Sequence, residues 1–184
     1  MKIIKFLSLG LCLSLVMACQ PKTSVSEDNA VVSYSQKFED YTQLDLQQLE
    51  NYASQNDALA RTQLALRYLM GVRGIQTKDP KKALTLLEQA MAQGEPEAIY
   101  QLSEFYITPS LSGIEDRNKS KNLLRQAAEA NHATAQMMLA TRLQFGAYEH
   151  ERNVEEAIYW YEKAVENGQM GAEIQLKILK EMKS

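Results

Sequence analysis

The sequence has few cysteine and histidine residues and no excess of basic residues, and each shortage excludes a class of function. It contains two Cys, two His and one Trp in 184 residues, with 20 basic and 23 acidic side chains. Sequence-independent binding to nucleic acid needs a basic surface, so we expect no nucleic-acid partner. One apolar run, 6–18, is too short for a membrane-spanning helix, which needs ~20 residues.

Motifs that would support catalysis are also missing. There is no Gly-x-Ser-x-Gly, Ser-x-x-Lys or His-Glu-x-x-His stretch, and no glycine-rich loop follows a predicted strand. His132 and His150 lie in predicted loops, so solvated side chains are expected; a weak metal site at His150 with Glu149 and Glu151 is the alternative. We therefore predict no enzymatic activity, no cofactor and no metal site.

The first 18 residues have the features of a secretion signal. Two lysines precede the apolar run, and Val16–Cys19 reads Val-Met-Ala-Cys, which resembles a bacterial lipobox. This resemblance to bacterial lipoproteins implies cleavage before Cys19 and acylation of that residue. Gln20 stands where Asp would imply retention in the inner membrane, so the resemblance implies a lipid anchor in the outer membrane, with the periplasmic face expected. An ordinary cleavable signal or an uncleaved anchor is the alternative.

Residues 19–42 are predicted to be the lipidated Cys and a flexible tether. They are polar, rich in Ser, Asp and Glu, and show no sustained helical period. A coil of ~20 residues has a root-mean-square reach of roughly 25 Å, which would keep the domain near the membrane. The other cysteine, Cys12, lies inside the signal. The mature chain would therefore have no thiol for a disulfide or a nucleophile.

Residues 43–184 show a repeat, with equivalent positions 37 residues apart. The repeated columns are Gly94, Asn131 and Gly168; Ala98, Ala135 and Ala172; Leu102, Leu139 and Leu176; Ala90, Ala127 and Ala164; and Asp79, Asp116 and Asn153. A weaker copy precedes them at a spacing of 38, with Ala60 in the column of Ala98. Such a period predicts stacked units, each too small to bury its apolar face alone.

Each unit is predicted to be two helices. The first (A-helix) has a small residue followed at intervals of four by Leu and often Tyr, which gives one apolar stripe. The second (B-helix) follows an Asp or Asn that can cap it. We expect A-helices near 58–70, 96–107, 133–145 and 171–182, B-helices near 80–93, 118–130 and 154–167, and a leading helix near 43–55. The predicted fold is an all-α, right-handed solenoid of antiparallel helix pairs, with about eight helices.

These residues resemble the Sel-1-like repeat, a relative of the tetratricopeptide repeat. The matching positions in the first full unit are Tyr68, Gly71, Gly74, Asp79, Lys82, Ala83, Ala90 and Gly94. The sequence departs from the pattern where a Gly is replaced by Ala65, Ser103 and Ala140, and the glycine pattern of the loops in the later units is degraded. In the last unit Lys177 and Lys180 occupy columns that are apolar or small earlier, which is typical of a solvent-facing cap.

Repeat solenoids usually bind partners on the concave face lined by A-helices. If tetratricopeptide geometry holds, the resemblance places a partner-binding groove at Leu66, Met70, Tyr100, Met137, Phe145, Ile174 and Ile178. The alternative is that these side chains are apolar only because neighbouring helices bury them. Their exposure distinguishes the two interpretations.

The expected function is a non-catalytic periplasmic scaffold or adaptor. It would be an outer-membrane lipoprotein that binds a protein or peptide partner of the cell envelope through its concave face. One alternative is an enzyme or modulator that acts on peptidoglycan. Another is a surface-exposed factor that contacts a host.

Overall fold

The computed structural model describes residues 37–183. The predicted signal peptide, Cys19 and the tether up to residue 36 lie outside the described residues. Those assignments therefore stay predictions here.

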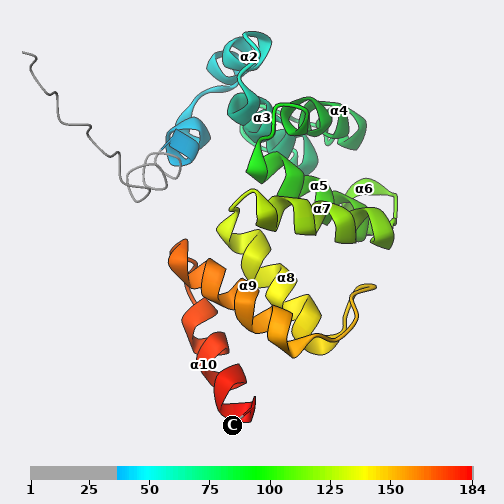
Figure 1. Cartoon of the computed structure of the whole chain (residues 1–184). Helices are drawn as coiled ribbons and strands as arrows, with labels where there is room; N and C mark the ends of the chain where they lie inside the picture. The colour runs from blue at the N-terminus through cyan, green and yellow to red at the C-terminus, as the bar shows by residue number, and fades with distance from the viewer. Residues whose placement is uncertain (1–36, 184) are drawn as a thin grey trace, which may run out of the picture.

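The described part of the chain is a stack of helices without strands (Figure 1). Its labelled helices are α2 (Leu46–Ser54), α3 (Ala58–Met70), α4 (Pro80–Met91), α5 (Pro96–Ile107), α6 (Pro109–Ser112), α7 (Arg117–Glu129), α8 (Ala133–Phe145), α9 (Val154–Glu166) and α10 (Ala172–Lys183). Helices α3, α5, α8 and α10 are the predicted A-helices, and α4, α7 and α9 are the B-helices. Each packs mainly against the helices before and after it, so the array extends from α2 to α10.

Two helical segments were not predicted: the short helix α6 and residues 37–43, which are described below. The short helix α6 lies in the loop between α5 and α7, where Pro109 occupies its first turn. Gly113 ends it with φ 71°, and its N–H donates to the Pro109 carbonyl over 2.7 Å. The loop that departs from the repeat pattern therefore contains a helix of its own. The number of helices among the described residues is larger than the eight predicted.

The B-helices begin at the predicted caps. The side chains of Asp79, Asp116 and Asn153 each accept a hydrogen bond from the backbone N–H three residues later, over 2.9–3.0 Å. The backbone N–H of the same residue also donates to a carbonyl near the end of the preceding A-helix. Each cap therefore both starts the B-helix and closes the loop within its repeat.

The joints between repeats use a left-handed backbone. Asn56, Gly94, Asn131 and Gly168 have φ values of 69°, 78°, 63° and 75°. Gly and Asn tolerate this conformation best, which explains why this column alternates between them. The turn directs each A-helix back across the B-helix before it.

Alanine fills two fully buried columns between the packed helices. Ala98, Ala135, Ala172 and the B-helix column of Ala90, Ala127 and Ala164 are 0% exposed. Large side chains fill the space beside them, and Leu124 and Tyr161 are almost completely buried. The small residues allow the helix axes to approach, and the large ones fill the remaining core.

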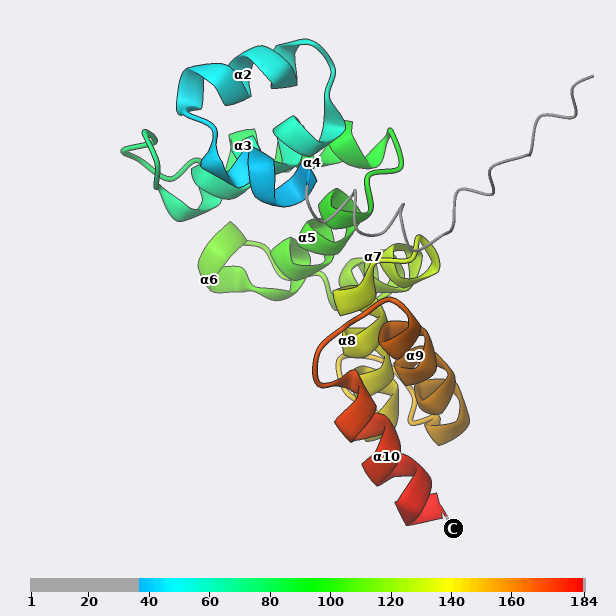
Figure 2. The same ribbon diagram turned by 90° about the vertical axis from the view of Figure 1, so that its left-hand side faces the viewer.

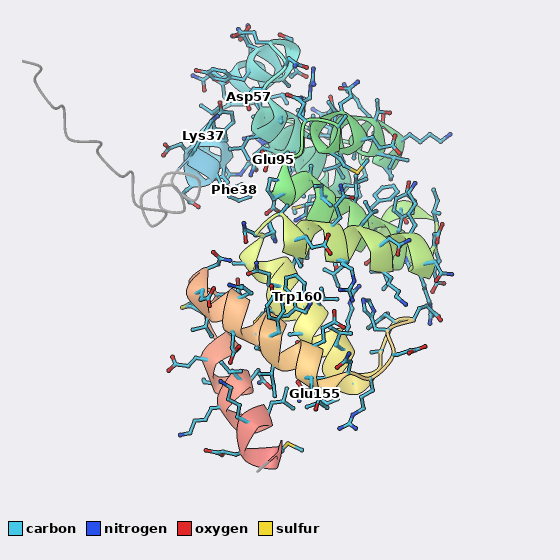
Figure 3. The ribbon with its side chains drawn as sticks, viewed as in Figure 1. Lys37, Phe38, Asp57, Glu95, Glu155 and Trp160 are labelled. Carbon is cyan, nitrogen blue, oxygen red and sulfur yellow. The ribbon has the colours of Figure 1, made fainter. Side chains whose placement is uncertain are left out.

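The C-terminal end of the predicted tether is ordered on the first repeat rather than flexible. Residues 37–43 are helical and lie against α3 (Figure 2). The Tyr41 hydroxyl donates to Asp57 over 2.8 Å, and Lys37 lies 3.4 Å from the same carboxylate (Figure 3). The guanidinium of Arg67 donates to the Leu44 carbonyl over 2.6 Å. The flexible tether predicted for 19–42 is therefore wrong for its last six residues, because these contacts hold them on the first repeat.

One side of α10 is charged. Lys177 and Lys180 are exposed, whereas Ala140 and Leu143, their equivalents in α8, are buried. Lys180 also bonds to Glu162 of α9 over 2.7 Å. Both lysines are exposed, as expected for a cap, and burial of these charges under another repeat would carry a desolvation penalty.

Across residues 37–183, every helix is too short or too polar to traverse a lipid bilayer.

Candidate functional site

The predicted groove residues are accessible to different degrees. Leu66, Tyr100 and Met137 are half-buried against the core, on α3, α5 and α8. The other four are exposed: Met70, Phe145, Ile174 and Ile178. None of the seven side chains is fully buried. Their exposure is therefore compatible with a partner-binding groove and does not fit side chains that serve only as core.

The centre of this surface is polar rather than an apolar groove. Tyr100 stacks on His132, with ring centroids 4.7 Å apart. The Nε2 atom of His132 lies 2.7 Å from a Glu97 oxygen, and its Nδ1 accepts the Ala135 N–H over 3.1 Å. These partners fit an imidazole with its proton on Nε2, which donates to Glu97 and caps α8. His132 therefore joins α5 to α8, and the expectation of a solvated loop histidine is wrong.

A second polar link lies beside Tyr100. The Arg142 side chain is 4% exposed; its Nη2 donates to Glu104 over 3.1 Å, and its guanidinium lies over the Tyr148 ring at 5.0 Å. Burial lowers the pKa of Arg142, and the nearby Glu104 carboxylate opposes that shift. Burial and the carboxylates of Glu104 and Glu97 raise the pKa of Tyr100 to about 12, so its hydroxyl stays a hydrogen-bond donor.

Sequence reasoning missed His132 and Arg142, although the register contained a signal for each. His132 lies three residues before Ala135, the position at which Asp57 caps α3. Arg142 shares a buried column with Phe105 and Leu179, and with Arg67 in the first repeat. A charge in a buried column indicates a partner, here Glu104 from the preceding repeat.

The last A-helix presents an apolar stripe to solvent. Met170, Ile174, Ile178 and Met182 recur every four residues and are 88%, 64%, 43% and 74% exposed. We name these four residues the α10 stripe. Four-residue spacing places Ile174, Ile178 and Met182 along one side of α10, and Met170 lies in the turn just before the helix. On another side of α10, Ala172 and Leu179 are buried in the core, and α9 is the main neighbour of α10. The stripe is therefore apolar surface without a covering helix among the described residues.

His150 is also buried, contrary to expectation. It is 4% exposed, and its Nδ1 lies 3.0 Å from the Tyr148 carbonyl and 3.2 Å from that of Ala147. Burial lowers the pKa of His150, which favours the neutral ring, although the two carbonyls oppose the shift. Among the described residues no three His, Cys, Asp or Glu side chains are grouped to hold a metal ion.

The fold is a helical-repeat array. Successive pairs of short helices stack on one another, with buried alanines between them. The sequence pattern of the Sel1 repeat matches residues 58–95, 96–132 and 133–169, more than half of the chain. The chain therefore belongs to the Sel1 repeat family. These boundaries separate successive A–B helix pairs, in agreement with the observed joints.

Solved structures resemble the chain over most of its length. A Sel1 repeat protein from Oxalobacter formigenes superposes with a TM-score of 0.61 and 26% identity, covering 70% of this chain and 95% of that one. A protective antigen of uropathogenic Escherichia coli strains, which displays an SLR fold, gives 0.60 and 27% identity over 68% of this chain and 26% of that chain. No curated protein matches the chain.

Membership of this family supports a general role. Sel1 repeat proteins are generally protein-interaction scaffolds and generally non-catalytic. The family thus favours a protein partner.

Proposed function

We propose that this protein is a non-catalytic scaffold that binds a protein or peptide of the cell envelope along its A-helices. The observation that carries the proposal is the α10 stripe, three apolar side chains exposed at helical spacing on α10 and an exposed Met170 in the turn before it. Contiguous exposed apolar surface of this kind marks interaction sites in soluble domains. Its four-residue spacing suits an amphipathic helix or extended peptide with apolar anchors.

The stripe continues a surface shared by the other repeats. Ile174 lies one repeat after Met137, and Met137 one repeat after Tyr100. The apolar anchors at the α10 end and the Tyr100–His132 pair further along would let one ligand make apolar contacts and hydrogen bonds. Methionine at both ends of the stripe can adapt its shape to a partner.

The proposed scaffold is held at the outer membrane by lipid on Cys19. The basic start, the apolar run and the Val-Met-Ala-Cys sequence support this placement. A lipid anchor would raise the local concentration of the scaffold near an envelope partner. Because a single acyl chain binds membranes only marginally, stable anchoring requires the multiple acylation expected of a bacterial lipoprotein.

Photo-crosslinking within cells tests the binding surface. A benzoylphenylalanine residue at position 178 is expected to yield a discrete adduct, because Ile178 would lie against the partner. The matched control is position 177 on the charged side of the same helix, where Lys177 is exposed and no adduct is expected. Ile178→Asp should weaken the adduct formed from position 174 by about fivefold or more, since an apolar contact would be replaced by a charge.

Equal adducts at 177 and 178 would contradict the proposed surface. Adducts at neither 174 nor 178 would contradict it as well.

Replacing Cys19 with serine tests the anchor. The variant is expected to lose acylation and to move from the membrane fraction to the soluble periplasmic fraction, because no lipid would hold it. Metabolic labelling with a palmitate analogue and fractionation are the measurements. Lys37→Gln serves as a control that leaves the lipobox intact.

Protease added to intact cells separates the two membrane faces. Resistance supports the periplasmic face. Cleavage would favour surface exposure, the second candidate, which the similarity to the Escherichia coli protective antigen supports.

A further inference from the structure

A small polar cavity lies beside the start of α9, away from the α10 stripe. Its volume is about 250 Å³. It is formed by α7, the end of α8, the loop after α8 and the first turn of α9. The lining residues are Lys121, Arg125, Leu143, His150, Glu151, Arg152, Asn153 and Glu156.

The charges around this cavity leave a positive balance. Three cationic and two anionic side chains line it, so one positive charge remains with His150 neutral. Arg125 pairs with Glu156 over 2.6 Å. Lys121 and Arg152 instead donate to neutral backbone carbonyls, those of Glu149 at 2.6 Å and Gln144 at 3.2 Å. These two cations therefore keep most of their capacity to attract an anion.

His150 contributes a buried acceptor without a partner. Its Nδ1 is directed at the carbonyls of Ala147 and Tyr148, so the proton belongs on that nitrogen. The opposite nitrogen, Nε2, then has a free lone pair, is shielded from solvent and has no hydrogen-bond partner among the described residues. Buried polar atoms are normally satisfied, so an unpaired acceptor on a cavity-lining ring indicates a missing donor.

We propose that this cavity binds a small organic carboxylate that carries an O–H or N–H donor next to the carboxyl group. Lys121 and Arg152 hold the carboxylate, and His150 Nε2 accepts from the neighbouring donor. This site is independent of the proposed partner-binding surface, because it lies on the B-helix side of the repeats.

The balance of charge favours a carboxylate over a phosphate dianion. A single negative charge neutralises the remaining positive charge, whereas a dianion would add repulsion with Glu151 and Glu156. The cavity is smaller than sites for drug-sized ligands, so it suits a small molecule or the end group of a larger one. Two sources share this chemistry: a 2-hydroxy acid, with its hydroxyl, and the carboxyl end of a peptide, with its amide N–H.

The chain contains a built-in reporter for this site. Trp160 is its only tryptophan, and the indole Nε1 donates to Glu156, a lining residue, over 3.3 Å. Its position on α9 is labelled in Figure 3. Filling the cavity should shift the Glu156 carboxylate or its local field and change Trp160 emission.

The test titrates the purified full chain with defined probes while Trp160 emission is followed. Lactate supplies a carboxylate with a hydroxyl, and N-acetylglycine supplies one with an amide N–H. Acetate lacks the donor, and lactamide lacks the charge. Lactate or N-acetylglycine should bind about tenfold more tightly than acetate, and lactamide should not bind, because each lost contact removes one hydrogen bond or charge.

Variants locate the binding in the cavity. Lys121→Gln and Arg152→Gln should each weaken the preferred probe about tenfold, whereas Lys81→Gln on the exposed face of α4 should leave it unchanged. Lys121 is partly exposed and Arg152 is exposed, so both cavity variants should fold normally. Their circular dichroism spectra should match that of the unmodified chain.

A preference for lactate identifies the hydroxy acid as the source, and a preference for N-acetylglycine identifies the peptide end. Equal binding of acetate, binding unaffected by both glutamine variants, or no response to millimolar lactate and N-acetylglycine would each overturn the proposal.

Discussion

Ala135→Leu is expected to destabilise the array by about 3 kcal/mol, toward the upper end for overpacked cores. Ala135 is 0% exposed at a helix crossing of α8, and its column is alanine in all four A-helices. Three additional carbon atoms can fit only if α8 moves away from its neighbours. That movement would open contacts in both adjoining repeats, because each repeat is stabilised by the next. Thermal melting followed by circular dichroism should show a decrease of roughly 10 °C.

Ala92→Leu provides the matched control. Ala92 ends α4 and is exposed, so the same added volume should change stability by no more than about 0.5 kcal/mol. If Ala135→Leu melts at the same temperature as Ala92→Leu, the crossing is not as close as the structure indicates.

Glu104→Ala is expected to cost about 2 kcal/mol, because it leaves the Arg142 guanidinium buried without its carboxylate. Removing one partner of a buried pair typically costs ~3–5 kcal/mol, and we reduce that value because the Glu104 side chain is 30% exposed. Chemical denaturation of the single variant measures the loss.

The double variant Glu104→Ala, Arg142→Leu should regain at least about 1 kcal/mol of that loss. The leucine introduced at position 142 is apolar, like Phe105 and Leu179, which occupy the same column in two other repeats. Additive effects of the two substitutions would show that the pair is not coupled, and a greater loss would show that Arg142 stabilises by packing.

Local signals were sufficient to predict most of the fold. Asp79, Asp116 and Asn153 determine where B-helices begin, and the Gly or Asn joints determine where the next A-helix follows. Both signals depend on residues within a few positions of one another, so the sequence reveals them. Helix α6 was missed because its proline and glycine lie in a loop that no longer follows the repeat.

The polar features could not be predicted because their parts come from different repeats. His132 meets Glu97 from 35 residues earlier, and Arg142 meets Glu104 from 38 residues earlier. The loop position of His150 suggested exposure, yet the surrounding elements bury it. Pattern within one helix predicts the faces of that helix, whereas burial of a loop depends on how the next helix pair folds back over it.

If Cys19 carries lipid, as proposed, the packing of residues 37–43 on the first repeat determines which end of the array lies next to the anchored segment. These residues lie beside α3, and α10 lies at the opposite end of the stack (Figure 1). The 18 residues from Cys19 to position 36 would span at most roughly 60 Å if fully extended. They join the described chain at Lys37, near the first repeat. The membrane-proximal end would then be the first repeat, and the α10 stripe would be the distal tip. A partner would meet the protein from the side facing away from the bilayer.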